Sequence, residues 1–170
     1  VDITNWAKEN DFLNRIEILT FIDNGVSIKW LLKTGAKVQN LLTKGSLNHL
    51  KYQLKQDPEE HFKLVKNEID LASNHNIITN VYLEDWSNGM RNSRQYVIDY
   101  MDFLYDQPIK RILLPDTLGI LEPSETYDYL SELVERYPKM PLDFHGHNDY
   151  DLSVSNALAA SRAGVNGLHL

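Results

Sequence analysis

The chain alternates short apolar runs with helical segments, and this alternation constrains its fold more than any other feature. Each apolar run ends abruptly in polar residues, and the run ends recur about every 30 residues. Runs this short, and this rich in Ile, Leu, Val and Tyr, are typical of buried parallel strands. The runs lie at Ile16–Ile22, Val38–Leu42, Asn80–Leu83, Arg111–Leu114, Leu142–Phe144 and from Gly167 onward.

Helical signals occupy the intervals between these runs. Asp57-Pro58-Glu59-Glu60 has the pattern of an N-cap, a proline at the first helical position and a capping-box glutamate. We also expect helices at 26–35 and 151–163, and the end of a preceding helix at 1–12. Apolar residues at helical spacing predict three further faces. These are Phe62, Val65, Ile69 and Ala72; Val97, Tyr100, Met101 and Leu104; and, after Pro123, Tyr127, Leu130, Val134 and Tyr137.

Strands that alternate with helices at this period form parallel βα units, in either an open doubly wound sheet or a (β/α)8 TIM barrel. The barrel is favoured because every strand ends in ionisable or hydroxyl residues, and a barrel gathers its active site from several strand ends. The chain also lacks the glycine-rich phosphate loops of doubly wound sheets. No linker divides it. We therefore predict one α/β domain over residues 1–170, a parallel barrel present as about five and a half of its eight units.

Composition excludes several classes of function. There are 17 Lys and Arg against 24 Asp and Glu, and this net charge of −7 argues against binding to nucleic acid phosphates. The absence of cysteine excludes disulfides, thiolate metal sites and cysteine nucleophiles. No stretch approaches the roughly 20 apolar residues of a membrane helix, and residues 1–15 do not have the pattern of a signal peptide. We therefore expect a cytoplasmic protein without nucleic acid or membrane partners.

The sharpest candidate for chemistry follows the fifth apolar run, at His145-Gly146-His147-Asn148-Asp149. Residues i and i+2 of a strand point to the same face, so the two imidazoles project together at the carboxyl end of the sheet. They can share a divalent metal, or they can form a hydrogen-bonded pair that lines a polar pocket. The residues alone leave both interpretations open, and a metal would need further ligands from elsewhere.

Three other strand ends carry polar groups that suit an anionic substrate. In Leu114–Gly119 we expect an exposed Asp116 carboxylate, and the Thr117 hydroxyl with adjacent N–H groups suits a substrate carboxylate. Glu84 can act as a general base or orient one. The structural alternative for Asp116 and Thr117 is an Asx turn, and that for Glu84 is a loop cap. For the loop that follows the second apolar run, the alternative is a solvated loop. A cation, a hydroxyl and an imidazole share one loop, which holds Lys44, Ser46 and His49.

We expect the remaining histidines to be structural or surface residues. These are His61, His75 and His169.

Four motifs follow one another along the chain in a distinctive order. They are Leu-Leu-Thr-Lys-Gly-Ser-x-x-His (41–49), Tyr-Leu-Glu-Asp-Trp-Ser (82–87), Leu-Pro-Asp-Thr-Leu-Gly (114–119) and Asp-Phe-His-Gly-His-Asn-Asp (143–149). This series resembles the 2-isopropylmalate synthase and homocitrate synthase branch of the metal-dependent aldolase-like TIM barrels, a superfamily that includes HMG-CoA lyase. The resemblance covers essentially the whole chain, and it implies barrel strands three to seven and the start of strand eight.

The resemblance implies an acyltransferase that condenses acetyl-CoA with the ketone of a 2-oxo acid in a Claisen reaction, as 2-isopropylmalate synthase does in leucine biosynthesis. It also implies a divalent metal, Mg²⁺, Mn²⁺ or Zn²⁺, that polarises the ketone. The residues implied are His145 and His147 for the metal, Glu84 and His49 for the catalytic network, and Thr117, Ser46 and Asp116 for the substrate.

The sequence also departs from the family pattern. The Arg-Asp-Gly motif of the family's first strand, which supplies a metal ligand and an enolate-stabilising arginine, is absent, and so is the Gly-x-Gly-Glu-Arg-x-Gly-Asn stretch after strand eight. We therefore expect the 170-residue chain itself to be inactive, because the incomplete metal site and the missing arginine each cost several kcal/mol of transition-state stabilisation. Gly146 stands where HMG-CoA lyases have Cys, which favours a synthase.

Two other functions stay open at this point. A metal-dependent lyase of the HMG-CoA lyase type would catalyse the reverse, C–C-cleaving reaction, and a barrel-derived module would bind or assemble without catalysis. Amidohydrolases also carry His-x-His, but on the first barrel strand, so they rank lower. Because an open barrel has exposed edge strands, we expect a homo-oligomer. The residues do not fix which 2-oxo acid, which metal or which regulation the protein uses.

Overall fold

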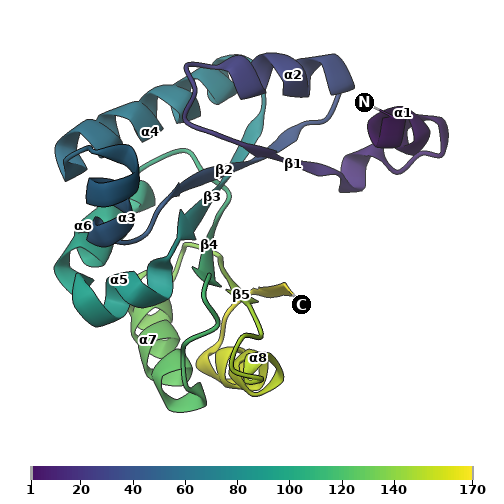
Figure 1. Ribbon diagram of the computed structural model, residues 1–170. Helices are drawn as coiled ribbons and strands as arrows, with labels where there is room; N and C mark the ends of the chain where they lie inside the picture. Colours follow the sequence, from purple (N-terminus) through teal and green to yellow (C-terminus); the bar gives the residue numbers. More distant parts are fainter. Residues whose placement is uncertain (1, 170) are drawn as a thin grey trace.

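The computed structural model describes residues 2–169. Six parallel strands pair in sequence order and form one curved sheet, and the larger helices cover its outer face (Figure 1). This is an α/β half-barrel, so the predicted fold is confirmed. The strands are β1 (Glu17–Thr20), β2 (Val38–Lys44), β3 (Ile78–Glu84), β4 (Arg111–Asp116), β5 (Leu142–Gly146) and β6 (Gly167–His169).

The helices lie between the strands as the apolar spacing predicts. Asp57 caps the longest helix by accepting a hydrogen bond from the Glu60 N–H at 2.8 Å. Glu122 and Glu125 form a capping box at the start of the helix that Pro123 opens. The helices are α1 (Asp2–Glu9), α2 (Val26–Thr34), α3 (Leu47–His49), α4 (Pro58–Asn74), α5 (Trp86–Asn92), α6 (Arg94–Tyr105), α7 (Pro123–Arg136) and α8 (Ser153–Ala163), with short turns η1 (Leu13–Arg15) and η2 (Leu50–Leu54).

Some sequence-based boundaries are wrong. Four strands extend beyond their apolar runs, because polar end residues such as Lys44 and Glu84 still pair across the ladder. The short helices α3 and α5 and the η2 turn are not predicted from the sequence at all. Tyr127 was expected on the buried side of α7, but it is 46% exposed, whereas Leu130 on the same helix is fully buried.

The hydrophobic core lies between the sheet and its outer helices. Alternate strand residues such as Leu41, Leu83 and Leu114 point into it and are fully buried. Helix α5 packs tightly against the sheet, because Trp86 is fully buried and a Cβ at Gly89 would lie 2.0 Å from the Gly45 carbonyl oxygen. The core therefore fixes α5 directly behind the carboxyl ends of β2 and β3.

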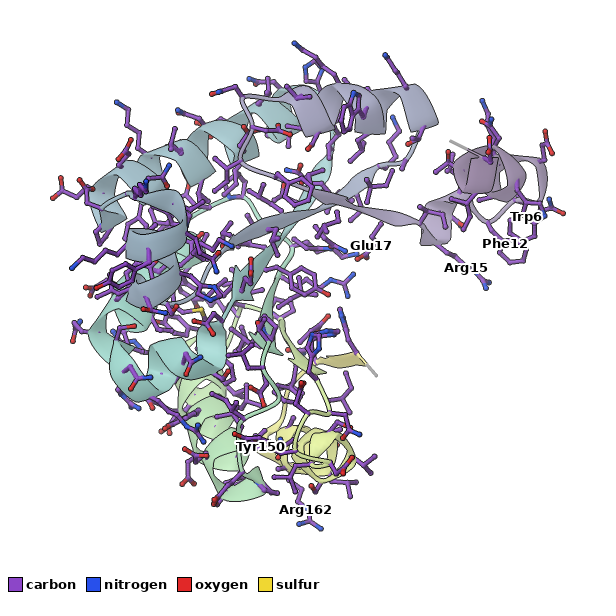
Figure 2. All side chains as sticks on the ribbon, in the orientation of Figure 1. Trp6, Phe12, Arg15, Glu17, Tyr150 and Arg162 are labelled. Carbon is purple, nitrogen blue, oxygen red and sulfur yellow. The ribbon has the colours of Figure 1, made fainter. Side chains whose placement is uncertain are left out.

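The inner, concave face of the sheet carries a polar layer. The Arg111 guanidinium on β4 donates to Asp143 on β5 at 3.0 Å and also pairs with Glu17 on β1. Asn80 donates to Asn40 at 2.8 Å within the same layer. Figure 2 shows Glu17 on this concave side of the ribbon. None of the described helices is both long and apolar enough to cross a membrane.

Candidate active site

The carboxyl ends of β2 to β5 meet at one edge of the sheet. The register pairs Lys44 with Glu84, and it pairs Pro115 with His145. Glu84 lies two residues beyond the Tyr82–Leu113 pair, which puts it level with Pro115. Glu84 and His145 are therefore two strand spacings apart, about 10 Å. The sheet thus brings together the motifs that the sequence placed at its strand ends.

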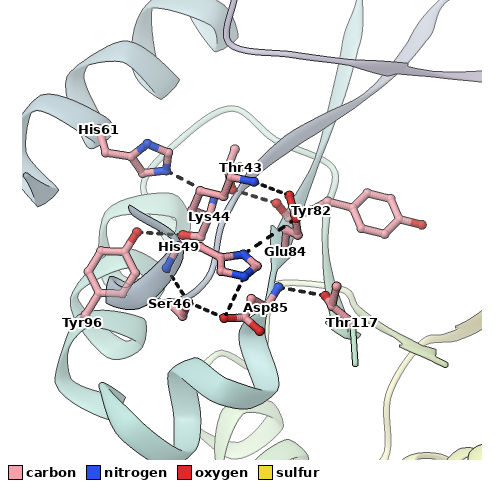
Figure 3. Close-up of polar contacts among 10 residues, drawn as sticks. All are labelled: Thr43, Lys44, Ser46, His49, His61, Tyr82, Glu84, Asp85, Tyr96 and Thr117. Atoms are coloured by element: carbon pink, nitrogen blue, oxygen red, sulfur yellow. Dashed lines mark hydrogen bonds and ion pairs between the residues drawn. The ribbon is translucent and has the colours of Figure 1, made fainter. Parts of the chain in front are cut away.

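Glu84 lies in a polar cluster with residues of the β2–α3 loop (Figure 3). Its Oε2 accepts from the Lys44 ammonium at 2.5 Å, and its Oε1 lies 3.8 Å from His49 Nδ1. The Tyr96 hydroxyl donates to the Lys44 carbonyl at 2.7 Å and so fixes the start of the loop. The structure therefore brings together Glu84, His49 and Lys44.

Asp85 follows Glu84 and links this cluster to the next strand. Its carboxylate accepts from the Ser46 hydroxyl at 2.6 Å, and its backbone N–H donates to Thr117 Oγ1 at 2.8 Å (Figure 3). The Ser46 hydroxyl also accepts from the His49 N–H at 3.2 Å, so it begins α3. Because Thr117 already accepts one hydrogen bond, its own hydroxyl proton is free to be donated to a ligand.

Asp116 is placed differently from the expectation. We expected its carboxylate to be exposed to the pocket, but Asp116 is fully buried, so that prediction is wrong. Its two oxygens accept from the backbone N–H groups of Ile120 and Leu121 at 3.1 and 2.9 Å. These bonds satisfy the carboxylate locally and hold the loop that carries Thr117, as an Asx-type turn does.

The loops that follow β4 and β5 are in backbone contact. The His147 N–H donates to the Asp116 carbonyl at 3.3 Å. Gly119 has a φ of 59°, and a Cβ there would lie 2.7 Å from the Asp149 backbone nitrogen. The loop that carries Thr117 and the loop that carries the two histidines therefore form one packed unit.

The two histidines of the His-Gly-His motif face each other. His145 Nε2 and His147 Nε2 are 3.3 Å apart, and the rings meet edge to face. His145 Nδ1 is buried without a hydrogen-bond partner in the described chain. Burial lowers the pKa of His145, and the nearby His147 and His169 lower it further, so the neutral form that binds metals is favoured. The 3.3 Å separation of the two Nε2 atoms would allow both to bind one divalent cation.

The described residues do not form a complete metal site. Within residues 2–169, no group of three or more His, Asp or Glu side chains is arranged to hold a metal ion. Any metal bound by the two imidazoles would need further ligands from outside these residues.

Sequence reasoning missed a polar chain below His145. The Tyr82 hydroxyl and His169 Nδ1 are 2.9 Å apart, and His169 Nε2 lies 3.3 Å from Asp143. The His145 ring packs edge-on against both Tyr82 and His169. Aligning the last two strands in register would have revealed this polar chain. His169 then pairs with His145, and Asp143, two residues before His145, lies on the same face.

His61 makes the stability of the site region dependent on pH. It is fully buried on α4, its Nε2 accepts from the Lys44 N–H at 3.4 Å, and its ring packs against Tyr100. Burial, and then the Lys44 charge, lower the pKa of His61 to about 4. An unfolded histidine binds its proton near pH 6.5. The unfolded state therefore holds more protons between these two pH values, and folding stability falls as the pH drops through them.

We expect His61 to account for a loss of up to about 3 kcal/mol in unfolding free energy between pH 7 and pH 4. Urea denaturation at pH 7.0 and 4.5 measures it. His61→Gln should remove most of this pH dependence, whereas His75→Gln, at an exposed position, should keep it. An unchanged pH dependence in His61→Gln would show that another group is responsible.

Comparison with known proteins identifies the class first. The fold is similar to that of HMG-CoA lyase from Bacillus subtilis, with a TM-score of 0.77 at 20% identity over 88% of this chain and 51% of that one. The carboxyl transferase domain of Rhizobium etli pyruvate carboxylase is also similar, with a TM-score of 0.67 at 18% identity over 89% of this chain and 26% of that one. These structural similarities show that the chain folds as part of a TIM barrel.

The family follows from sequence comparison. The HMGL-like family model matches residues 14–169, and the chain belongs to that family. It is 34% identical to homocitrate synthase from Saccharolobus islandicus over 121 residues. The aligned segment is 71% of this chain and 26% of that protein. It is 30% identical over 122 residues to a probable 2-isopropylmalate synthase from Methanopyrus kandleri, 72% of this chain and 24% of that protein.

These matches confirm the resemblance inferred from the four motifs. The chain spans about a quarter of the length of the curated relatives it matches.

Proposed function

We propose that this chain is the part of an acyltransferase that binds the 2-oxo acid in a Claisen condensation with acetyl-CoA, of the type catalysed by 2-isopropylmalate synthase. The observation that carries the proposal is the meeting of Glu84, His49 and Thr117 with the His145–His147 pair at one edge of the sheet. A carboxylate, an imidazole and a free hydroxyl donor beside a cation-binding pair suit a small anionic ketone.

His145 and His147 would hold a divalent metal, Mg²⁺, Mn²⁺ or Zn²⁺, which when bound polarises a ketone oxygen. The Thr117 hydroxyl would donate to the 2-oxo acid carboxylate, since its oxygen already accepts from the Asp85 N–H. Asp116 supports this role from behind, because its carboxylate holds the backbone of the Thr117 loop. The Lys44 ammonium pairs with Glu84 and so holds that carboxylate in the site.

Glu84 and His49 would belong to the catalytic network, with Glu84 near the ketone of the 2-oxo acid. The 3.8 Å separation of Glu84 Oε1 and His49 Nδ1 makes the two groups neighbours within one network. Ser46, which begins α3 and binds Asp85, would line this pocket and fix the loop. The homo-oligomer and the cytoplasmic location stay predictions from the sequence.

Calorimetric titration of the chain with Mn²⁺, followed by 2-oxoisovalerate, tests the proposal. We expect Mn²⁺ to bind the wild type and to bind His147→Ala at least about tenfold more weakly, since loss of even an outer-shell partner commonly costs that much. His75→Ala, at an exposed histidine, is the matched control and should bind as the wild type does.

Thr117→Val should weaken 2-oxoisovalerate binding while leaving Mn²⁺ binding intact. Equal Mn²⁺ affinity in the wild type and His147→Ala would contradict the proposal and favour a non-catalytic module. Binding of a hydroxyacyl-CoA without any binding of 2-oxo acids would favour a lyase instead.

A further inference from the structure

Asp85 is a buried carboxylate held in an unusual backbone conformation. It is fully buried, and its φ of 66° lies in the left-handed region that costs most residues conformational energy. Such strain persists where the surrounding structure over-determines it, and it is concentrated at functional sites. Asp85 directly follows Glu84, and Figure 3 shows it beside Ser46 and His49 in the polar cluster.

Three side chains surround this carboxylate. The Ser46 hydroxyl donates to Oδ2 at 2.6 Å, and the Asn88 amide donates to Oδ1 at 2.8 Å. His49 Nε2 lies 3.5 Å from Oδ2. No Lys or Arg side chain forms an ion pair with Asp85 in the described part of the chain, so these polar neighbours satisfy the buried charge.

The contact with His49 has a chemical consequence for the imidazole. Both ring nitrogens of His49 lie near a carboxylate, and an ionised carboxylate only accepts hydrogen bonds. Glu84 already pairs with the Lys44 ammonium, whereas Asp85 has no cationic partner in the described chain, so the nitrogen that faces Asp85 is the one that carries the proton. In a neutral imidazole the other nitrogen then carries a lone pair. That nitrogen is His49 Nδ1, which is buried, makes no hydrogen bond within residues 2–169, and faces Glu84.

We propose that Asp85 is a positioning residue that holds His49 with Nε2 protonated and directs the Nδ1 lone pair into the site. The Ser46 hydroxyl, bound both to Asp85 and to the His49 N–H, keeps the imidazole in reach of the carboxylate. The role of the directed nitrogen in a Claisen reaction rests on the proposed function, but the tautomer itself does not. Asp85 therefore acts through His49 rather than on a ligand.

Nitrogen-15 NMR of the histidine rings in the ligand-free chain at pH 8.5 tests the proposal. His49→Gln assigns the His49 signals. We expect Nε2 of His49 to have the shift of a protonated nitrogen and Nδ1 that of an unprotonated one. Asp85→Gly removes the carboxylate and suits the positive φ. In this variant we expect the two shifts to exchange, because Nδ1–H can then donate to Glu84.

Two further variants complete the test. Asp85→Asn offers an amide oxygen as acceptor and should restore the wild-type pattern at least in part. Asp11→Gly makes the same change at an exposed residue with a φ of 64° and should change nothing at His49. Protonated Nδ1 in the wild type would overturn the proposal, even if Asp85→Gly does not fold. So would a folded Asp85→Gly with unchanged His49 shifts. Failure to bind 2-oxoisovalerate would count against the proposed function alone.

Discussion

Trp86→Ala is expected to lower the free energy of unfolding by about 4 kcal/mol, the largest loss we expect from any single substitution. Trp86 is the first residue of α5, is fully buried, and packs edge-on against Tyr129 of α7 with ring centroids 6.4 Å apart. Its truncation leaves a cavity that the rigid sheet behind it cannot fill. Urea denaturation followed by circular dichroism measures the change.

Trp30→Ala is the matched control, because Trp30 is 65% exposed. It should change the unfolding free energy by no more than about 0.5 kcal/mol. Trp86→Phe should lose less than Trp86→Ala, since a ring still fills most of the site. Equal losses in Trp86→Ala and Trp30→Ala would mean that α5 is not packed as described.

Gly89→Ala is expected to lower the unfolding free energy by about 3 kcal/mol, against the usual trend for helices. Alanine in a helix normally stabilises it by about 1 kcal/mol relative to glycine. At Gly89, however, the new Cβ would lie 2.0 Å from the Gly45 carbonyl oxygen and 2.7 Å from a Val97 methyl carbon. Either α5 or the β2–α3 loop must move, and that loop follows Lys44 and carries the Ser46 side chain of the site.

Asn92→Ala provides the comparison on the same helix, at an exposed position where added helix propensity is harmless. We expect it to change stability by no more than about 0.5 kcal/mol. The same denaturation experiment reports both variants. A Gly89→Ala protein as stable as the wild type would show that the close approach of α5 to Gly45 does not exist in solution.

The sequence predicts the strands and the larger helices well, because burial leaves a strong pattern in these segments. The apolar runs and the Asp57 cap both correspond to observed elements. The ends of the strands are predicted less well, since Lys44 and Glu84 look like loop residues yet pair in the ladder. Helix α5 is missed because it contains Gly89 and is stabilised by tertiary packing rather than by helix propensity.

The candidate site, like the fold, could be predicted from the sequence only in part. The His145–His147 pair could be predicted because His145 lies on β5 and His147 follows directly after the strand, so the two-residue spacing still brings both side chains to one side. The buried state of Asp116 and the partners of His169 could not be predicted, since they depend on how separate segments meet. Local chemistry is therefore readable from residue types, whereas the burial of a polar group is decided by tertiary contacts.

Arg111 helps to maintain the curvature of the sheet. Its guanidinium, on β4, pairs with Glu17 on β1, and in a flat sheet these strands would be three spacings, about 14 Å, apart. The same guanidinium also donates to Asp143 on β5. One cation on the concave side thus draws together carboxylates from both halves of the sheet. The bend that sets the direction of every side chain in the site is consequently maintained from within, by a charge that lies beneath the histidines.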